Sequence, residues 1–345
     1  MNKALKQLLF TFDYELYLGA DSGSVTKCLL EPTTALFNLL ERYNCKGILF
    51  VDTTYLLQLQ KLAKANTFTK ATTDYKEICA QLQFLHENNW EIHIHLHPHW
   101  NEATYNPTSN KWQLNNYTNY RLHTLDVNTI DGLIKESQQL LASILNIPIT
   151  QLDSYRAGGW SIQPFEYLVN VFKNNGIKYD FSCLNNHANL NENFYYDYTN
   201  IVENSIYKFE DNIGEISENG SFTELSISAW KKPSTQFNRI GGKLINKLLW
   251  KAGYTTWGDG KAAKTPHNNT SVVNNNYEMI SVELLTMHNY LCYKKFIRNN
   301  SYMQFISHSK MINKHNLHML NSFLKHTVAH YAINTNFREI PEIKN

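Results

Sequence analysis

Histidine gathers in one short stretch of this sequence, EIHIHLHPHW over residues 91–100. The four imidazoles belong to His93, His95, His97 and His99. Apolar residues alternate with the first three, as in a strand, where every second side chain lies on the same face. Pro98 then interrupts the pattern, because a central strand rarely contains proline. Since imidazole is a common metal ligand, the stretch predicts a metal site at the carboxyl end of a strand.

Three other predicted strands also end in residues that can do chemistry. FTFDYE contains Asp13 and Glu15, which are two residues apart and therefore on one face of a strand. YRAGGWS contains Arg156, followed by two glycines that let backbone approach a ligand closely. FISHSK contains His308. Carboxylates, imidazoles and a guanidinium at the same end of several strands indicate an active site.

The residues alone leave the histidine ligands open. Two histidines and a carboxylate, with coordination positions left free, form a typical catalytic metal site. Residues four apart on an extended strand are separated by about 13 Å, too far for two ligands of one ion. Either His93 and His95 bind as a strand pair, or His95 and His99 bind across the bend at Pro98. A third possibility is that His93 and His97, which are also four residues apart, bind the ion instead of His95 and His99.

The elements that must position these residues alternate between strands and helices. Strands are predicted at residues 7–13, 46–52, 90–95, 152–157, 177–183, 277–288 and 301–308. Helices are predicted at residues 31–44, 73–89, 127–146, 163–176 and 315–332. This alternation favours an α/β fold, either a parallel barrel or a doubly wound sheet. Residues from about 190 to 277 are irregular and rich in Asn, Gly and Tyr, which indicates an insertion into a single domain spanning 1–345.

The composition limits the class of partner. A net charge of +2 gives no general attraction to nucleic acid. Only 18% of residues are charged, and a surface rich in Asn and Tyr suits sugars better than polyanions. Five scattered cysteines without a CxxC pair indicate neither a disulfide framework nor a zinc ribbon. The first residues contain no transmembrane segment and no cleavage site, so we expect the protein in the cytoplasm.

The motifs and their order resemble those of the polysaccharide deacetylase family (NodB-homology domains, carbohydrate esterase family four). TFDYE at 11–15 is similar to the family's TFDD, and HLHPH at 95–99 to its HTHPH. RAGGW at 156–160 resembles its arginine motif, and SHSK at 307–310 its last histidine motif. The resemblance implies a distorted (β/α) barrel with about seven strands. It also implies metal-dependent removal of N-acetyl or formyl groups from amino sugars.

The resemblance also implies roles for the metal ligands. The register of the second motif selects His95 and His99 as the histidine ligands. The family's second aspartate, its usual metal ligand, is replaced here by Tyr14. We therefore expect Glu15 to be the carboxylate ligand, with Asp13 as the alternative. The ion is expected to be Zn²⁺, with Co²⁺, Mn²⁺ or Ni²⁺ as other possibilities.

The remaining roles follow from the same resemblance. Asp13 is expected to be the general base, held ionised by Arg156. His308 would protonate the departing amine, with His288 as the alternative acid. The family's fourth motif has no clear match, so Asp180 is only a candidate to orient His308. The expected substrate contacts are Trp160, Trp100 and Tyr14.

These expectations lead to one main hypothesis, a deacetylase acting on an N-acylated sugar of a surface glycan or on its lipid- or nucleotide-linked precursor. One alternative is a deformylase of a lipid-linked amino sugar or a hydrolase of another linear amide. Another is a carbohydrate-binding barrel without activity, which the substitution at Tyr14 and the missing motif would fit. Peripheral membrane contact is suggested by the segment 238–253, whose cations share one helical side. They are Arg239, Lys243, Lys247 and Lys251. The ordinary alternative is an amphipathic helix packed on the barrel.

Overall fold

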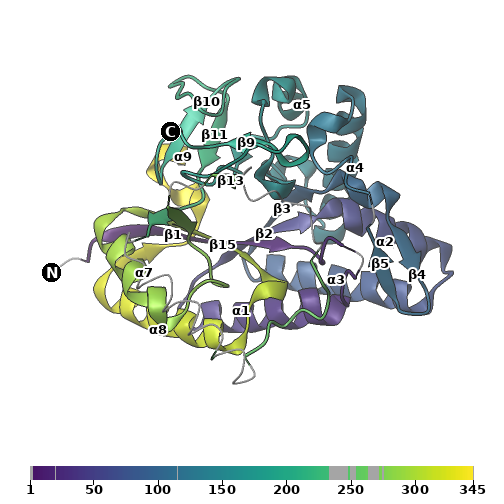
Figure 1. Cartoon of the computed structure of the whole chain (residues 1–345), viewed down its shortest axis with the longest axis horizontal. Coiled ribbons are helices and arrows are strands. Elements are labelled where there is room, and N and C mark those ends of the chain that lie inside the picture. Colours follow the sequence, from purple (N-terminus) through teal and green to yellow (C-terminus); the bar gives the residue numbers. More distant parts are fainter. Residues whose placement is uncertain are drawn as a thin grey trace.

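A curled sheet is the centre of the fold, which we describe from a computed structural model. The structure describes residues 3–19, 21–114, 116–232, 248, 254–262, 272–273 and 276–344. The strand order is β10-β11-β7-β6-β3-β2-β1-β15, and β16 pairs with β1. Figure 1 shows helices α8, α1 and α3 along one side of the sheet. From β11 to β15 every neighbouring pair on this path is parallel. The result is a distorted (β/α) barrel with seven parallel strands along this path; β16 pairs parallel with the amino end of β1, and β10 adds antiparallel to β11.

The barrel sheet consists of β1 Leu5–Tyr14, β2 Gly47–Asp52, β3 Glu91–Leu96, β6 Ser154–Ala157, β7 Tyr179–Asp180, β10 Ile206–Phe209, β11 Phe222–Leu225, β15 Tyr302–His308 and β16 Ala332–Asn334. The smaller strands are β4 Thr104–Asn106, β5 Lys111–Gln113, β8 Ala188–Asn189, β9 Tyr196–Asp197, β12 Ala229–Lys231, β13 Val272–Val273 and β14 Tyr277–Met279. The helices are α1 Glu31–Glu41, α2 Thr53–Ala65, α3 Thr69–Glu87, α4 Val127–Leu145, α5 Val169–Asn174, α7 Met287–Asn299, α8 Lys314–His330 and α9 Pro341–Lys344.

Strand β1 shows how the alternation of side chains separates the core from the barrel interior. Phe12 stacks on Trp90 on the outer side, and the Tyr14 hydroxyl donates to Gln81 of helix α3. Thr11 and Asp13 point the other way, into the barrel, where both are buried. The outer face of β1 is therefore apolar, and its inward face changes from apolar at Leu9 to polar toward the carboxyl end.

The barrel is closed loosely between β15 and β11. Two loop segments bridge this gap, because Gln304 donates its backbone N–H to the Ser228 hydroxyl and Ile306 donates to the Ile280 carbonyl. Near the carboxyl end of β15, the Val282 N–H donates to the Ser307 hydroxyl at 2.8 Å. These bonds satisfy the edge of β15, which would otherwise present unpaired backbone groups.

The amino ends of the strands are closed by the last residues of the chain. Phe337 is fully buried there against Phe181 and belongs to an apolar cluster inside the barrel that also contains Leu9 and Phe50. The interior of the barrel is therefore filled by apolar side chains at its amino end.

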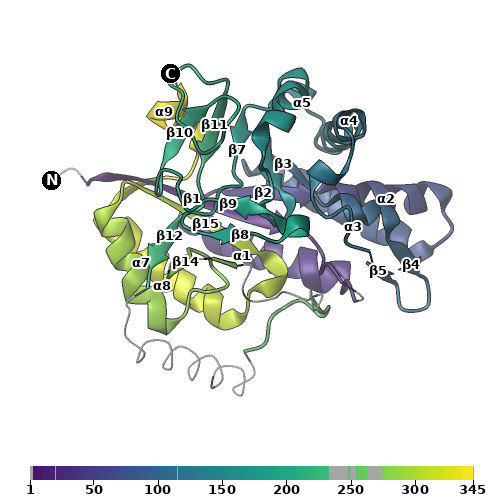
Figure 2. The same cartoon turned by 45° about the horizontal axis from the view of Figure 1, so that its top comes forward.

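Parts of the fold differ from the sequence-based prediction. The expected strand at 277–288 ends at Met279, and helix α7 begins at Met287. Helix α2 was not predicted; Asp52 begins it by accepting the Tyr55 N–H at 3.3 Å. Strands β10 and β11 fall inside the expected insertion but join the barrel sheet, whereas β8 and β9 lie across its face (Figure 2). The basic segment 238–253 lies outside the described residues apart from position 248.

Candidate active site

The register of the parallel strands brings their polar ends to one level. Asp13 is paired with His308 across β1 and β15, and Asp52 with His95 across β2 and β3. His95 in turn is paired with Arg156 of β6. Five adjacent strand ends therefore supply one site, as parallel barrels generally do at their carboxyl face.

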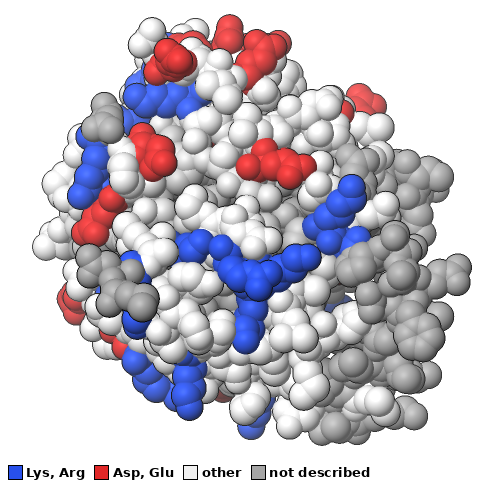
Figure 3. Space-filling view, turned by 90° about the vertical axis from the view of Figure 1, so that its left-hand side faces the viewer, with Lys and Arg blue, Asp and Glu red and all other residues white. Residues whose placement is uncertain are grey.

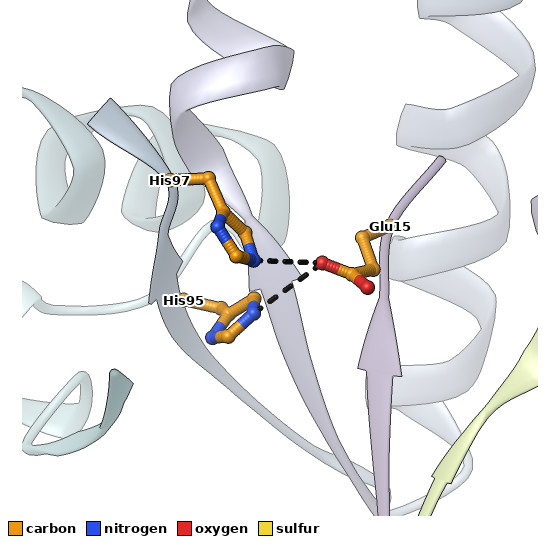
Figure 4. A group of neighbouring side chains, drawn as sticks. All are labelled: Glu15, His95 and His97. Atoms are coloured by element: carbon orange, nitrogen blue, oxygen red, sulfur yellow. Dashed lines mark ion pairs between the residues drawn. The ribbon is translucent and has the colours of Figure 1, made fainter. Parts of the chain in front are cut away.

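Glu15, His95 and His97 form a compact cluster of ligand atoms (Figure 4). Glu15 Oε2 lies 2.9 Å from His97 Nε2 and 3.5 Å from His95 Nε2. One ligand atom from each residue lies within 4.8 Å of the other two, and all three side chains are buried. One carboxylate oxygen and two imidazole nitrogens form a donor set that suits Zn²⁺ and similar divalent ions.

The hydrogen bonds around the cluster leave its inner atoms free for an ion. His95 Nδ1 donates to the Arg156 carbonyl oxygen at 2.8 Å, which leaves Nε2 with its lone pair toward Glu15. Glu15 Oε2 is buried and lies close to both imidazole nitrogens, but it accepts no well-aligned hydrogen bond among the described residues. A buried carboxylate oxygen without a hydrogen bond is costly unless a cation satisfies it. The residues therefore fit a divalent ion.

Lys310 holds the other oxygen of the same carboxylate. Its Nζ donates to Glu15 Oε1 at 2.8 Å and to the Leu16 carbonyl at 2.6 Å, and the ammonium lies 5.2 Å from the centre of the Tyr17 ring. Burial raises the pKa of Glu15, but Lys310 and the imidazoles of His95 and His97 hold it well below its usual value. Glu15 is therefore a carboxylate with one oxygen fixed and the other facing the histidines.

Asp13 is fixed as a carboxylate by Arg156. Arg156 Nη1 lies 2.6 Å from Asp13 Oδ1, and Nη2 donates to the Thr11 hydroxyl at 2.7 Å. The guanidinium also donates through Nε to the Phe181 carbonyl and lies 4.2 Å from the centre of the Phe50 ring. Burial raises the pKa of Asp13, but Arg156, together with His95 and His308, outweighs this and lowers it. Arg156 itself is fully buried, so it acts through Asp13.

His308 carries the opposite charge to Asp13 and Glu15, and it faces one oxygen of each carboxylate. Its Nε2 lies 3.7 Å from Asp13 Oδ2 and 3.5 Å from Glu15 Oε1. On the other side, Glu283 accepts the His308 backbone N–H at 2.7 Å and lies 3.3 Å from Nδ1. Burial lowers the pKa of His308, but Glu283 and the two other carboxylates raise it to about 9. His308 is therefore an imidazolium beside a carboxylate.

Glu283, not Asp180, contacts His308. Asp180 is buried lower in the barrel, where it accepts hydrogen bonds from the backbone and hydroxyl of Ser182 and lies beside Cys183 and Glu224. No sequence pattern indicates Glu283, because it lies in a loop within the range expected to be a strand, 277–288. Lys310 and Asp52 were also missed. Asp52 is fully buried at the end of β2, and burial raises its pKa against the opposing influence of His97 and His95.

The remaining histidines of the cluster lie apart from the ligand atoms. His99 is buried among Trp100, Tyr117 and Tyr120, and its ring centre is 5.5 Å from that of His97. His93 lies at the closed end, with its Nε2 3.0 Å from Glu91. The expected pair His95 and His99 is thus replaced in the cluster by His95 and His97, and His288 lies on helix α7.

A cavity of about 370 Å³ opens beside these groups, and its volume is in the ~300–1,000 Å³ range typical of ligand pockets. Asp13, Glu15, His95, His97 and His308 line it on one side. Aromatic side chains form much of the rest, namely Tyr17, Tyr117, Tyr120, Trp160, Phe194 and Tyr196. Of the three expected substrate contacts, only Trp160 lines the cavity. Trp100 and Tyr14 are buried in the core, against Tyr55 and Gln81 respectively.

The glycine pair after Arg156 makes room for protein groups as well as a ligand. A Cβ on Gly158 would lie 2.7 Å from His97 Nδ1, and one on Gly159 would lie 2.5 Å from the Tyr120 ring. Gly159 also has a φ of +58°, which residues with a side chain rarely adopt. The two glycines therefore let Tyr120 and His97 pack closely beside the metal ligands.

Fold and site together define an α/β-barrel protein with a buried carboxylate–imidazole cluster at the carboxyl ends of its strands. No family model matches the sequence, and no curated protein matches it either. Among solved structures, it is similar to a "putative polysaccharide deacetylase" from Mycobacterium smegmatis, with 13% identity over 96% of this chain and 87% of that chain and a TM-score of 0.47. A "probable polysaccharide deacetylase" from Pseudomonas aeruginosa PAO1 has 10% identity, coverage of 98% and 89%, and a TM-score of 0.47. The PuuE allantoinase has 9% identity, coverage of 99% and 90%, and a TM-score of 0.46.

These similarities are too distant to assign an activity, so the functional proposal rests on the side chains of the site. Among the described residues, no helix is long and apolar enough to cross a membrane.

Proposed function

We propose that this protein is a metal-dependent hydrolase that removes an N-acetyl or other N-acyl group from an amino sugar of a surface polysaccharide or its precursor. One observation carries the proposal. A carboxylate, Asp13, and an imidazolium, His308, face each other at 3.7 Å in a cavity that also contains a three-residue metal cluster. Two titratable groups whose surroundings give them opposite roles are what acid–base hydrolysis requires.

Glu15, His95 and His97 would hold the ion. When bound, a divalent ion such as Zn²⁺ lowers the pKa of a coordinated water to about 7 and polarises a carbonyl oxygen. Co²⁺, Mn²⁺ or Ni²⁺ can take the same donor set. Because Lys310 occupies Glu15 Oε1, the carboxylate offers only Oε2 to the ion.

The other residues of the chain move and hold protons. Asp13 Oδ2 accepts a proton from the attacking water, because Oδ1 is already engaged by Arg156. His308 Nε2 donates a proton to the amine nitrogen as the carbon–nitrogen bond breaks. Glu283 keeps the ring oriented through its contact with Nδ1 and keeps it charged before the reaction.

The walls of the cavity favour a sugar over other amides. Flat aromatic faces stack on the apolar faces of sugar rings, and Trp160 and Tyr196 stand beside each other there with ring centres 5.9 Å apart. Asn189 adds an amide that can bond sugar hydroxyls. The charged residues of the lining pair with one another, and the rest of the wall is mainly aromatic; they are Asp13, Glu15, Glu283, His308 and Lys310.

The test is hydrolysis by purified protein loaded with Zn²⁺ or Co²⁺. N-acetylated and N-formylated amino sugars, free, nucleotide-linked and lipid-linked, are offered, and acetate, formate and new amine are measured. We expect release of the acid, with a loss of about 10²–10⁴-fold in Asp13→Asn and in His308→Ala. Formate without acetate would favour the deformylase. Sugar binding without turnover at any metal loading would favour the inactive barrel and contradict the proposal.

A further inference from the structure

Helix α7 exposes an apolar and cationic face that the proposed reaction does not use. Met287 is 70% exposed and Leu291 is 69% exposed, more than any other large apolar side chain among the described residues. At 100° per residue, these two fall with Lys294, Lys295 and Arg298 inside an arc of about 100°. The opposite side of the helix packs on the barrel through Asn289, Tyr293, Phe296 and Ile297.

More cations surround this face from neighbouring elements. The Tyr290 hydroxyl of α7 donates to the Ser322 carbonyl of α8, so the two helices lie side by side, and Lys325 is exposed on α8. Lys3, which is exposed, donates to the Val328 carbonyl at the end of α8. Lysine and arginine side chains form a band across this side of the molecule (Figure 3).

Acidic residues are missing from the same stretch of sequence. Between Glu283 and Glu339 there is no Asp or Glu, and seven Lys or Arg residues occur there. Of the seven, Lys310 is buried in the site and Arg338 is paired with Glu91 and Asp153. The cations of α7 and α8 therefore have no acidic partner within their own helices. Favourable interaction with the helix dipole explains cations at the end of α7. It does not explain two exposed apolar residues in the first turns.

We propose that the α7 face, defined by Met287, Leu291, Lys294, Lys295 and Arg298, docks on an anionic phospholipid surface. The two apolar side chains would enter the interface, and the cations would lie at the level of the lipid phosphates. A soluble polyanion would need the cations but not Met287 and Leu291, so the lipid surface explains more of the face. The docking does not depend on the proposed hydrolysis, and it does not use the segment 238–253.

The face lies near the mouth of the site along the chain. Glu283, which contacts His308, precedes Met287 by four residues, and Asn316 of α8 donates to the Glu283 carbonyl. The first turns of α7 therefore lie at the same end of the barrel as the site.

Vesicle flotation tests the docking on the full chain. We expect binding to vesicles that contain phosphatidylglycerol, little binding to phosphatidylcholine alone, and weakening by salt because the charges are exposed. Lys294→Glu with Lys295→Glu should reduce the partition coefficient by at least about tenfold, since each cation near the surface contributes about fivefold. Met287→Ser with Leu291→Ser should also reduce it, by several-fold.

Matched controls are available on other faces. Lys61→Glu with Lys64→Glu changes two exposed lysines of α2, and Ile216→Ser removes a side chain that is 59% exposed. Both controls should bind vesicles as the wild type does, and circular dichroism should show that every variant is folded. The proposal is overturned if the wild type ignores anionic vesicles or if the α7 variants bind unchanged. It is also overturned if only the charge variants fail and heparin binds the apolar variant as well as the wild type, which would indicate a soluble polyanion.

Discussion

Lys310 Nζ and Glu15 Oε1 lie 2.8 Å apart in the interior of the site, on the carboxylate oxygen that His95 and His97 do not face. Both side chains are buried, at about 5% exposure each. The carboxylate is therefore neutralised and oriented by the protein before any ion binds. A pre-oriented ligand lowers the entropic cost of binding the ion.

Replacing Lys310 by Met should make the stability of the protein depend more on the metal. Without the ammonium, Glu15 loses its nearer cation and keeps only the His308 imidazolium at 3.5 Å. Removing one partner of a buried pair costs about 3–5 kcal/mol. A bound ion would restore much of this stability. Urea unfolding with a chelator and with Zn²⁺ should show a wider gap between the two midpoints in Lys310→Met than in the wild type.

The control for Lys310→Met is Lys27→Met, which breaks an exposed pair with Glu31 at 2.7 Å. Exposed pairs contribute about 0–1 kcal/mol, so this variant should unfold almost as the wild type does with or without metal. An unchanged gap in Lys310→Met would show that Lys310 does not support the Glu15 carboxylate.

His97 and His99 should differ in their effect on metal content. The structure places His97 Nε2 beside Glu15, whereas His99 packs among aromatic rings. We expect His97→Phe to lose bound zinc and His99→Phe to retain it, as measured by elemental analysis after dialysis and by calorimetric titration. Retention by His97→Phe together with loss by His99→Phe would restore the pair that the sequence motif implies.

Glu283→Gln should lower kcat more than it changes KM. The Glu283 carboxylate contacts both the backbone N–H and the ring of His308. Glu283 itself takes no part in the proposed proton transfers. Loss of the charge leaves the imidazole less firmly oriented, and we expect a fall in kcat of about 10–100-fold, smaller than for His308→Ala. Asp180→Asn is the comparison, because Asp180 bonds Ser182 instead. A larger effect on KM than on kcat would assign Glu283 to substrate binding.

The strand ends could be predicted from the sequence because a buried parallel strand is a continuous apolar run and its last polar residue is conspicuous. Asp13, Arg156 and His308 are of this kind, and the register brings them together. The two histidines nearest Glu15 could not be chosen in this way, because the distance between two imidazoles depends on where the strand ends. Strand β3 ends at Leu96, so His95 and His97 still point to the same side and His99 lies beyond the turn.

Residues that reach the site from loops left no periodic signal. Glu283 follows a three-residue strand, and Lys310 lies in a single helical turn after β15. Their roles come from tertiary contacts with His308 and Glu15, at separations of 25 and 295 residues. Tyr14 is the opposite case, a residue that the sequence places beside the site but the fold turns away from it. It is next to Asp13 in sequence, but alternation turns it to the outer side of the sheet, toward Gln81.

At the closed end of the barrel, Arg338 should set the acid stability of the fold. It bonds Glu91 at 2.8 Å and Asp153 at 2.8 Å, and Glu91 also contacts His93. Burial raises the pKa of Glu91, but His93 and Arg338 outweigh it and lower the pKa to about 2, compared with 4.5 for the free side chain. A lowered folded-state pKa stabilises the protein above about pH 4.5, and this contribution is lost as the pH falls toward 2.

In Arg338→Met the pKa of Glu91 moves back toward its ordinary value, so acid unfolding should begin at a higher pH than in the wild type. The shift is modest, because Glu91 and Arg338 are 26% and 33% exposed and solvent screens the pair. Tryptophan fluorescence along a pH titration measures the midpoint. Lys135→Met, which breaks the exposed pair with Asp131 on α4, should leave the midpoint in place. Equal midpoints for Arg338→Met and the wild type would mean that the pair does not contribute to acid stability.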